Sequence, residues 1–160
     1  MTQLHNVLYA VCEESSIITM YTADTLSPLG EDIHVEGMGH PTDILACRHE
    51  RQLYVAELNC IWRVSVDDHS YVKWLTTQST TDRFHIWTLS LTSRRLLVTS
   101  REPPTVRQYS TTNKELLCVV QVPQYVESLW HAMEMRRETF IVCHKGTSQD
   151  NEQFAVSELF

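Results

Sequence analysis

The sequence has little of what marks disulfide-stabilised, membrane-spanning or helical proteins. Its five cysteines include no C-x-x-C pair, and an odd number scattered through apolar segments is not typical of a disulfide framework. No apolar run approaches the roughly 20 residues that a membrane-spanning helix needs. No segment shows the sustained apolar spacing of an amphipathic helix. We therefore expect a cytoplasmic, all-β protein with reduced thiols.

The motifs that carry common enzyme chemistry are also missing. The eight histidines are spread over different segments, and they form no H-E-x-x-H or paired Cys/His pattern. There is no G-x-S-x-G nucleophile motif, and the glycines of Gly37-Met38-Gly39 lack the following helix of a phosphate-binding loop. The sequence therefore predicts no catalytic residue, no metal and no cofactor.

Positive charge is the minority charge of this chain. Thirteen basic residues stand against twenty acidic ones, which gives a formal net charge of −7. A net acidic surface repels phosphate, so RNA and anionic membranes are disfavoured as partners, although a local basic patch can override the average. The charge balance favours a protein partner.

What the sequence does contain is a repeat. An apolar strand, a polar break and a second apolar strand return about every 44 residues, a period typical of propeller blades and solenoid units. The recurring phrase is Leu8-Tyr9-Ala10, Leu53-Tyr54-Val55, Leu96-Leu97-Val98 and Phe140-Ile141-Val142. The repeat predicts an all-β, propeller-like array of four-stranded antiparallel blades. We expect one domain over residues 1–160, with units at approximately 5–39, 40–80, 81–123 and 124–160.

The two central units each show four short strands bounded by turn-forming residues. In the first of them, Glu57-Leu58-Asn59 forms a hairpin turn, and Trp62 shares a face with Val64 and Val66 but not with Ile61. The predicted strands are Asp43 to Arg48, Gln52 to Glu57, Cys60 to Val66, Tyr71 to Thr76, Phe84 to Leu91, Arg95 to Thr99, Val106 to Ser110 and Leu116 to Val122. The four tryptophans, Trp62, Trp74, Trp87 and Trp130, are expected to fill the space between blades.

The outer units look shorter. The first opens at its second strand, Asn6 to Cys12, and its outer strand near Asp32 to Val35 lies in a segment that reads as readily as a loop. The last unit has strands at Glu127 to Met135, Thr139 to His144 and Phe154 to Leu159. The array therefore has about three and a half to four blades. Two interpretations stay open: a compact four-unit propeller, or part of a larger ring whose other blades are absent or come from a second copy.

Two segments resemble a known repeat. His40-Pro41-Thr42-Asp43-Ile44, followed by Gln52-Leu53-Tyr54-Val55-Ala56-Glu57, is similar to the NHL repeat, in which a proline-led inner strand precedes an apolar-Tyr-Val-Ala-acidic second strand. The segments 87–98, 140–150 and 156–159 also look like blades of NHL-like propeller proteins. The resemblance implies a platform for protein interaction or RNA binding.

Arginines recur at the turn between the first and second strands of three successive blades. Equivalent turns lie on one face of a propeller, so these side chains are candidate contacts for an acidic protein segment or a phosphate backbone. The candidates are Arg48, Arg51, Arg94, Arg95, Arg136 and Arg137. They favour a non-enzymatic interaction scaffold that binds through blade-connecting loops.

Two other functions remain open. A propeller channel gathers residues from the inner strands of several blades, and His85, His131 and Asp43 lie near three of these strands. They are the candidates for a metal or polar site in an ester or lactone hydrolase. The third alternative is a fragment of a larger propeller protein without a function of its own.

Overall fold

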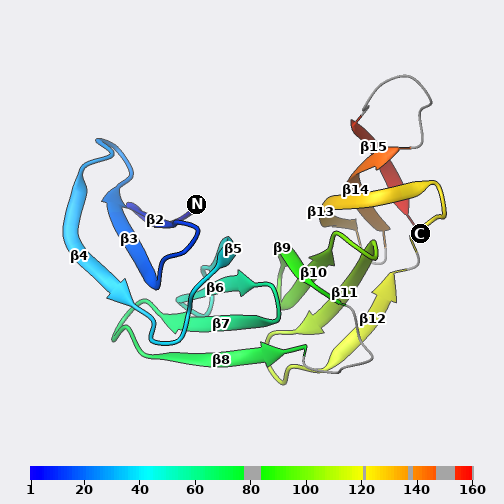
Figure 1. Cartoon of the computed structure of the whole chain (residues 1–160). Helices are drawn as coiled ribbons and strands as arrows, with labels where there is room; N and C mark the ends of the chain where they lie inside the picture. Colours follow the sequence, from blue (N-terminus) through cyan, green and yellow to red (C-terminus); the bar gives the residue numbers. More distant parts are fainter. Residues whose placement is uncertain (78–83, 121, 137–138, 147–153, 160) are drawn as a thin grey trace. The chain divides into compact units, whose positions relative to one another are not determined.

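The computed structural model describes residues 1–77, 84–120, 122–136, 139–146 and 154–159. In these residues the chain forms strands joined by turns and connections (Figure 1). None of them forms a helix long and apolar enough to cross a membrane.

The strands build four antiparallel sheets, in each of which a strand pairs with its neighbour in sequence. Sheet one contains β1 (Thr2–Leu4), β2 (Val7–Val11), β3 (Ile17–Thr22) and β4 (Pro28–His34). Sheet two contains β5 (Pro41–Cys47), β6 (Gln52–Glu57), β7 (Cys60–Ser65) and β8 (Tyr71–Thr76). Sheet three contains β9 (Ile86–Thr92), β10 (Arg95–Ser100), β11 (Thr105–Ser110) and β12 (Leu116–Val120). Sheet four contains β13 (Val126–Arg136), β14 (Thr139–Gly146) and β15 (Phe154–Leu159). We call these sheets blades 1 to 4.

The predicted all-β array of antiparallel blades is confirmed, and blade 4 has the three strands that the sequence indicates. The expectation that blade 1 lacks its inner strand is wrong. Thr2–Leu4 pairs antiparallel with Val7–Val11, and the side chain of Leu4 is buried at 1% exposure. Three residues are too few to show alternation, so the sequence carries no strand signal there. The segment near Asp32 to Val35, which the sequence indicates equally as a strand or a loop, lies at the end of β4. Within this strand only Ile33 is buried.

Contacts divide the chain into two compact units, residues 1–76 and 77–160, and each is described by itself. In the first unit, blades 1 and 2 pack through one apolar core. Tyr9 and Ile18 of blade 1 meet Leu53, Val55 and Trp62 of blade 2. Trp62 and Val64 belong to this core and Val66 packs against it, which agrees with the predicted strand faces.

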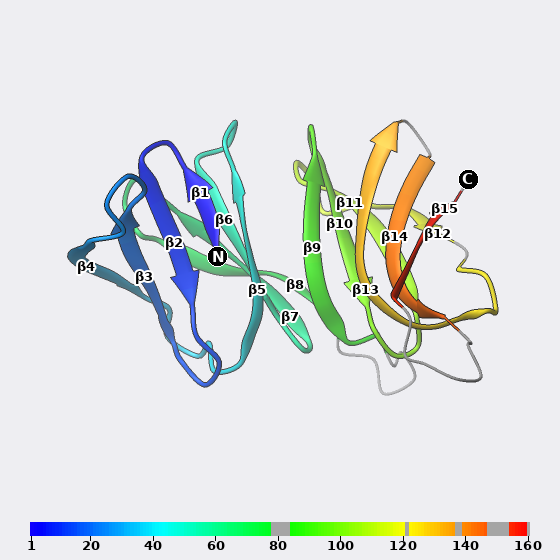
Figure 2. The ribbon, with the colours of Figure 1, turned by 90° about the horizontal axis from the view of Figure 1, so that it is seen from above.

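The second unit repeats this packing with blades 3 and 4. Leu97 and Val106 of blade 3 share a core with Leu129, Phe140 and Val142 of blade 4. Figure 2 shows β9 and β13, the first strands of the two blades, side by side. Each unit is thus a pair of blades packed face to face. The prediction of a single domain over residues 1–160 stays a prediction.

Candidate functional site

The turns that join the first and second strands of the blades share a backbone feature. In blades 1, 2 and 3 one turn residue that is not glycine has a positive φ: His5 at 53°, Arg51 at 52° and Ser93 at 53°. A left-handed backbone at one residue lets the chain reverse within a few residues. The turns of blades 2 and 3 carry Arg48, Arg51 and Arg94, three of the arginines that the sequence singles out.

In the first unit the two candidate arginines differ in their surroundings. Arg48 is exposed and has no charged partner among the described residues. The Arg51 guanidinium pairs with Asp67, its Nε lying 2.8 Å from Oδ1 and 3.0 Å from Oδ2. This pair raises the pKa of Arg51 and lowers the pKa of Asp67. Arg51 therefore joins two turns of blade 2 and offers less of its charge to a partner.

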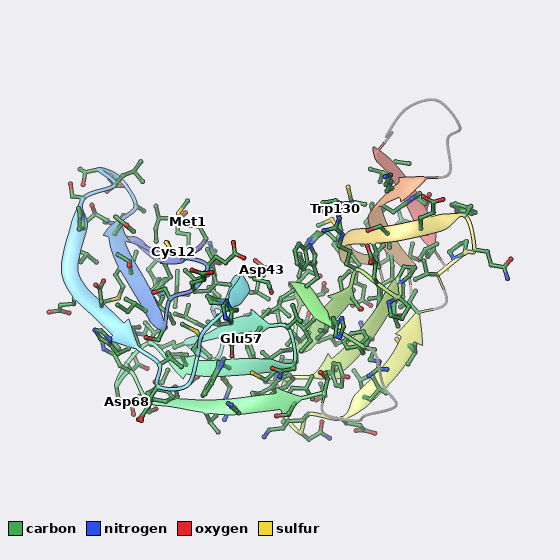
Figure 3. The ribbon with its side chains drawn as sticks, viewed as in Figure 1. Met1, Cys12, Asp43, Glu57, Asp68 and Trp130 are labelled. Carbon is green, nitrogen blue, oxygen red and sulfur yellow. The ribbon has the colours of Figure 1, made fainter. Side chains whose placement is uncertain are left out.

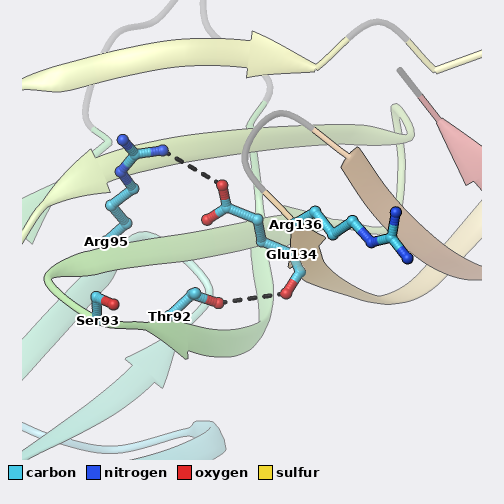
Figure 4. Close-up of a pocket in the computed structure, with 5 residues that line it drawn as sticks. All are labelled: Thr92, Ser93, Arg95, Glu134 and Arg136. Atoms are coloured by element: carbon cyan, nitrogen blue, oxygen red, sulfur yellow. Dashed lines mark hydrogen bonds and ion pairs between the residues drawn. The ribbon is translucent and has the colours of Figure 1, made fainter.

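In the second unit two candidate arginines line one cleft of about 290 Å³ (Figure 4). Its lining residues are Thr92, Ser93, Arg95, Glu134 and Arg136. Arg136 is exposed and directed away from Glu134, and among the described residues it has no acidic partner. Arg94 is exposed in the turn beside the cleft. Arg137, the sixth candidate, lies outside the described residues.

A buried carboxylate holds the cleft together. Glu134 of β13 is 8% exposed, and its Oε1 accepts from Arg95 NH1 of β10 at 3.3 Å. Its Oε2 accepts from Gln108 Nε2 of β11 at 2.9 Å. The Arg95 side chain keeps 35% of its surface exposed. Glu134 thereby orients a guanidinium that a second anion can still reach.

Hydroxyl groups fix β9 against β13 below the cleft. Thr88, Ser90 and Thr92 alternate along β9, and each donates to a main-chain carbonyl of β13. The oxygen-to-oxygen distances are 3.0 Å to Trp130, 2.6 Å to Ala132 and 3.5 Å to Glu134. Because inner strands of neighbouring blades are not joined by a main-chain ladder, these bonds set how blades 3 and 4 meet.

Arg101 lies against two inner-strand tryptophans of this unit. Its guanidinium is 5.4 Å from the Trp87 ring centroid and 4.2 Å from that of Trp130, and the two rings meet edge to face at 6.5 Å. Both tryptophans were expected to fill space between blades, and they do so while leaving part of their surface exposed beside a cation. The Arg101 Nε also donates to Ser128 Oγ at 3.1 Å.

The second buried carboxylate, Glu57, lies in blade 2 (Figure 3). Its Oε1 accepts from the main-chain N–H groups of Gly39 and His40 at 2.6 Å and 2.9 Å. Its Oε2 accepts from Trp62 Nε1 at 2.6 Å and from Cys60 Sγ at 3.2 Å. Burial alone would raise the pKa of Glu57, but these four donors outweigh burial and lower it. Glu57 fastens the connection between blades 1 and 2 and has no oxygen left for a ligand.

The candidates of the hydrolase hypothesis, His85, His131 and Asp43, have separate surroundings. His85 is exposed, and His131 Nδ1 lies 3.2 Å from Thr88 Oγ1 in the β9–β13 contact. Asp43 belongs to the other unit, and its Oδ1 accepts from the main-chain N–H of Ile44 at 2.8 Å. Over the described part of the chain, no three His, Cys, Asp or Glu side chains are grouped so that they could hold a metal ion.

No family model and no curated protein matches the sequence. Solved structures do match. Hydrazine synthase of Kuenenia stuttgartiensis aligns with a TM-score of 0.73 and 12% identity over 97% of this chain and 44% of that chain. U3-55K aligns with a TM-score of 0.70 and 16% identity over 98% of this chain and 48% of that chain. The WD40 β-propeller domain of Doa1 aligns with a TM-score of 0.66 and 13% identity over 89% of this chain and 46% of that chain. The fold is that of β-propeller blades.

This similarity concerns the fold alone, because the identities are low. The chain spans about half the length of these three solved structures. A WD40 domain is among the similar structures, and the fold shared with it is that of a β-propeller. The finer assignment to NHL repeats stays a prediction.

Proposed function

We propose that this protein is a non-enzymatic interaction scaffold that binds an acidic segment of a partner protein through the turns between the first and second strands of its blades. The observation that carries the proposal is the cleft of the second unit, where Arg95 and Arg136 line one hollow and Arg94 lies in the adjoining turn. Rigid strands carry these turns, and binding residues are commonly found on loops that such a scaffold positions.

The charges at the cleft favour a carboxylate ligand. Glu134 neutralises one of the three guanidiniums, and it lies buried beneath Arg95 rather than at the surface. Arg94 and Arg136 keep their donors exposed. A guanidinium binds a carboxylate through two parallel hydrogen bonds, so two adjacent side chains of a Glu-rich or Asp-rich peptide match the two arginines.

A protein segment is favoured over RNA because the chain as a whole is acidic. The formal net charge of −7 opposes a long phosphate backbone, which must cross more of the surface than the cleft. A short acidic peptide needs only the cleft and the turns beside it. The five cysteines are free and suit a reducing compartment, which supports a cytoplasmic location. NHL-like repeats remain the proposed repeat type.

The proposal is tested by fluorescence anisotropy with a labelled hexaglutamate peptide. We expect the wild-type chain to bind this probe more weakly as salt is added, because the contact is electrostatic. Arg136→Glu, in which a carboxylate replaces an exposed guanidinium at the cleft, should weaken binding by about tenfold or more. A labelled oligouridine of similar length serves as the RNA probe.

Lys73→Glu is the matched control. Lys73 is exposed on the outer strand of blade 2, so this substitution changes the net charge equally without touching the cleft. If both variants lose binding to the same degree, net charge rather than the cleft binds the peptide, and the proposal is wrong. Preference for the oligouridine over the peptide would also contradict it.

A further inference from the structure

Because the blades repeat, the residues on an exposed sheet face of one blade can be compared with residues at the same positions in another blade, where that face is buried. The phrases Leu8-Tyr9-Ala10, Leu53-Tyr54-Val55, Leu96-Leu97-Val98 and Phe140-Ile141-Val142 lie on β2, β6, β10 and β14, the second strands of the four blades. Side chains alternate along a strand, so the middle residue of each phrase faces opposite to the two residues that flank it. Equivalent positions can therefore be compared from blade to blade.

The middle residue faces the following blade. Tyr9 of blade 1 is 3% exposed in the core shared with blade 2, and Leu97 of blade 3 is fully buried in the core shared with blade 4. The flanking residues face the preceding blade. Leu53 and Val55 are fully buried against blade 1, and Val142 is fully buried against blade 3. Blade-on-blade packing thus uses the same two faces in both units.

Within the first unit, blade 1 presents the flanking-residue face without a blade against it. Leu8 and Ala10 occupy the positions of Leu53 and Val55, yet both remain partly exposed. An apolar hollow of about 310 Å³ lies on this face. Its lining residues are Met1, Leu8, Ala10, Tyr21 and Leu26.

Blade 4 presents the complementary face. Ile141 occupies the position of Tyr9 and Leu97 and is partly exposed, and directly opposite it on β13 lies Met133, which is 48% exposed. Cys143, the next residue on this face, pairs with Val156 of β15, which is 70% exposed. Within the described residues of the second unit, no following blade covers this face.

We infer that the exposed face of blade 4 packs against the exposed face of blade 1 of a second copy of this chain. The two faces are the two halves of an interface that the chain already forms twice, once in each unit. A second copy supplies both missing halves, Leu8 and Ala10 for one face and Ile141 for the other. The contact is heterologous, because different surfaces of the two copies meet.

The length of the similar structures agrees with this pairing. The chain covers 44% to 48% of the solved structures described above, so two copies together are about as long as one such structure. Two copies can then form two identical contacts, each between blade 4 of one copy and blade 1 of the other. We expect a dimer.

Light scattering after size exclusion on the full chain measures this directly. The expected mass is twice that of the 18.6 kDa chain. Leu8→Asp and Ile141→Asp each place a charge in both contacts of the dimer, so each should raise the dissociation constant by about tenfold or more. Leu58→Asp is the control, because Leu58 is 47% exposed in a hairpin turn away from both faces and its substitution should leave the dimer intact.

Mixing the two variants separates a blade 4 to blade 1 contact from other modes of association. The Leu8→Asp chain keeps a native blade 4 face and the Ile141→Asp chain keeps a native blade 1 face, so the mixture regains one intact contact and should again contain dimer. Circular dichroism confirms that each variant is folded. A monomeric wild-type chain, a mixture that stays monomeric, or a mass that neither substitution lowers would each overturn the inference.

Discussion

The Arg95 guanidinium of blade 3 donates to the buried carboxylate of Glu134 in blade 4, and this ion pair joins the two blades at the edge where the cleft opens. Glu134 is 3% exposed in its side chain and Arg95 is 35% exposed. The buried partner therefore serves the packing of the unit, while the exposed partner faces the solvent. One contact links the stability of the second unit to the proposed binding site.

We predict that Glu134→Ala lowers the free energy of unfolding by about 2–3 kcal/mol, because Gln108 and Arg95 lose their shared acceptor in a buried setting. Urea denaturation followed by tryptophan fluorescence measures the loss. Glu115→Ala is the control, since Glu115 is exposed in the turn before β12 and should change stability by less than about 0.5 kcal/mol. Equal losses in the two variants would show that Glu134 has no special role.

The hydroxyl contacts between β9 and β13 give a second prediction. Ser90→Ala removes the donor of the 2.6 Å bond to the Ala132 carbonyl and should cost about 1 kcal/mol. Thr112→Ala, at an exposed turn position, is the control and should be close to neutral. The same urea titration compares the two variants. An unchanged unfolding midpoint for Ser90→Ala would mean that the Ser90 hydroxyl bond does not stabilise the contact between blades 3 and 4.

The strands of the central blades could be predicted closely because alternation and turn residues define them locally. Gln52–Glu57 and Tyr71–Thr76 have the predicted bounds, and the other predicted strands of blades 2 and 3 differ by at most two residues at an end. The face of Trp62 was also predicted, because β7 pairs with β6 in an unbroken register. Local periodicity is enough when a strand is regular and flanked by clear turns.

Glu134 could not be predicted, because β13 is irregular. The register of β13 against β14 shifts three times, between Val126 and Ser128, between Leu129 and His131, and between Glu134 and Arg136. Each irregularity changes which side chains face inward, so alternation in the sequence does not show that a glutamate is buried. The buried site of Glu57, which lies where a predicted strand meets a predicted turn, could not be predicted either, because its four donors come from the chain on both sides of it.

The candidate arginines that the structure describes lie in turns or at strand ends next to them, but the sequence does not indicate which side chains pair with them. Arg51 pairs with Asp67, which is 16 residues further along the chain. The pair exists because β6 and β7 form a hairpin that brings the turn before β6 and the turn after β7 to the same edge. Side-chain pairing of this kind depends on the register of the two strands. The charged residues of a turn, read from the sequence alone, do not show which of them will pair.

Cysteine reactivity tests the packing around Glu57. Burial, the hydrogen bond to Glu57 and the negative charge of Glu57 together raise the pKa of the Cys60 thiol to about 12. The thiolate is the reactive form, so Cys60 should resist iodoacetamide at mildly alkaline pH. Cys12 is exposed and should be alkylated first. Peptide mass spectrometry over time measures both, and equal rates in the folded chain would contradict the buried site.

The last prediction concerns acid stability. Because the folded state lowers the pKa of Glu57 below its ordinary value of 4.5, the ionised carboxylate stabilises the fold. This contribution is complete above pH 4.5 and is lost as the pH falls through the lower pKa of the folded state.

Glu57→Gln places an amide that cannot accept at one oxygen position, so two of the four donors lose their acceptor, at a cost of about 2–3 kcal/mol near neutral pH. Urea titrations across this pH range should show a smaller acid loss in Glu57→Gln than in the wild type. Glu36→Gln, at an exposed position of the same connection, should keep the wild-type pH profile. If Glu57→Gln also keeps it, another group governs the acid sensitivity of the first unit.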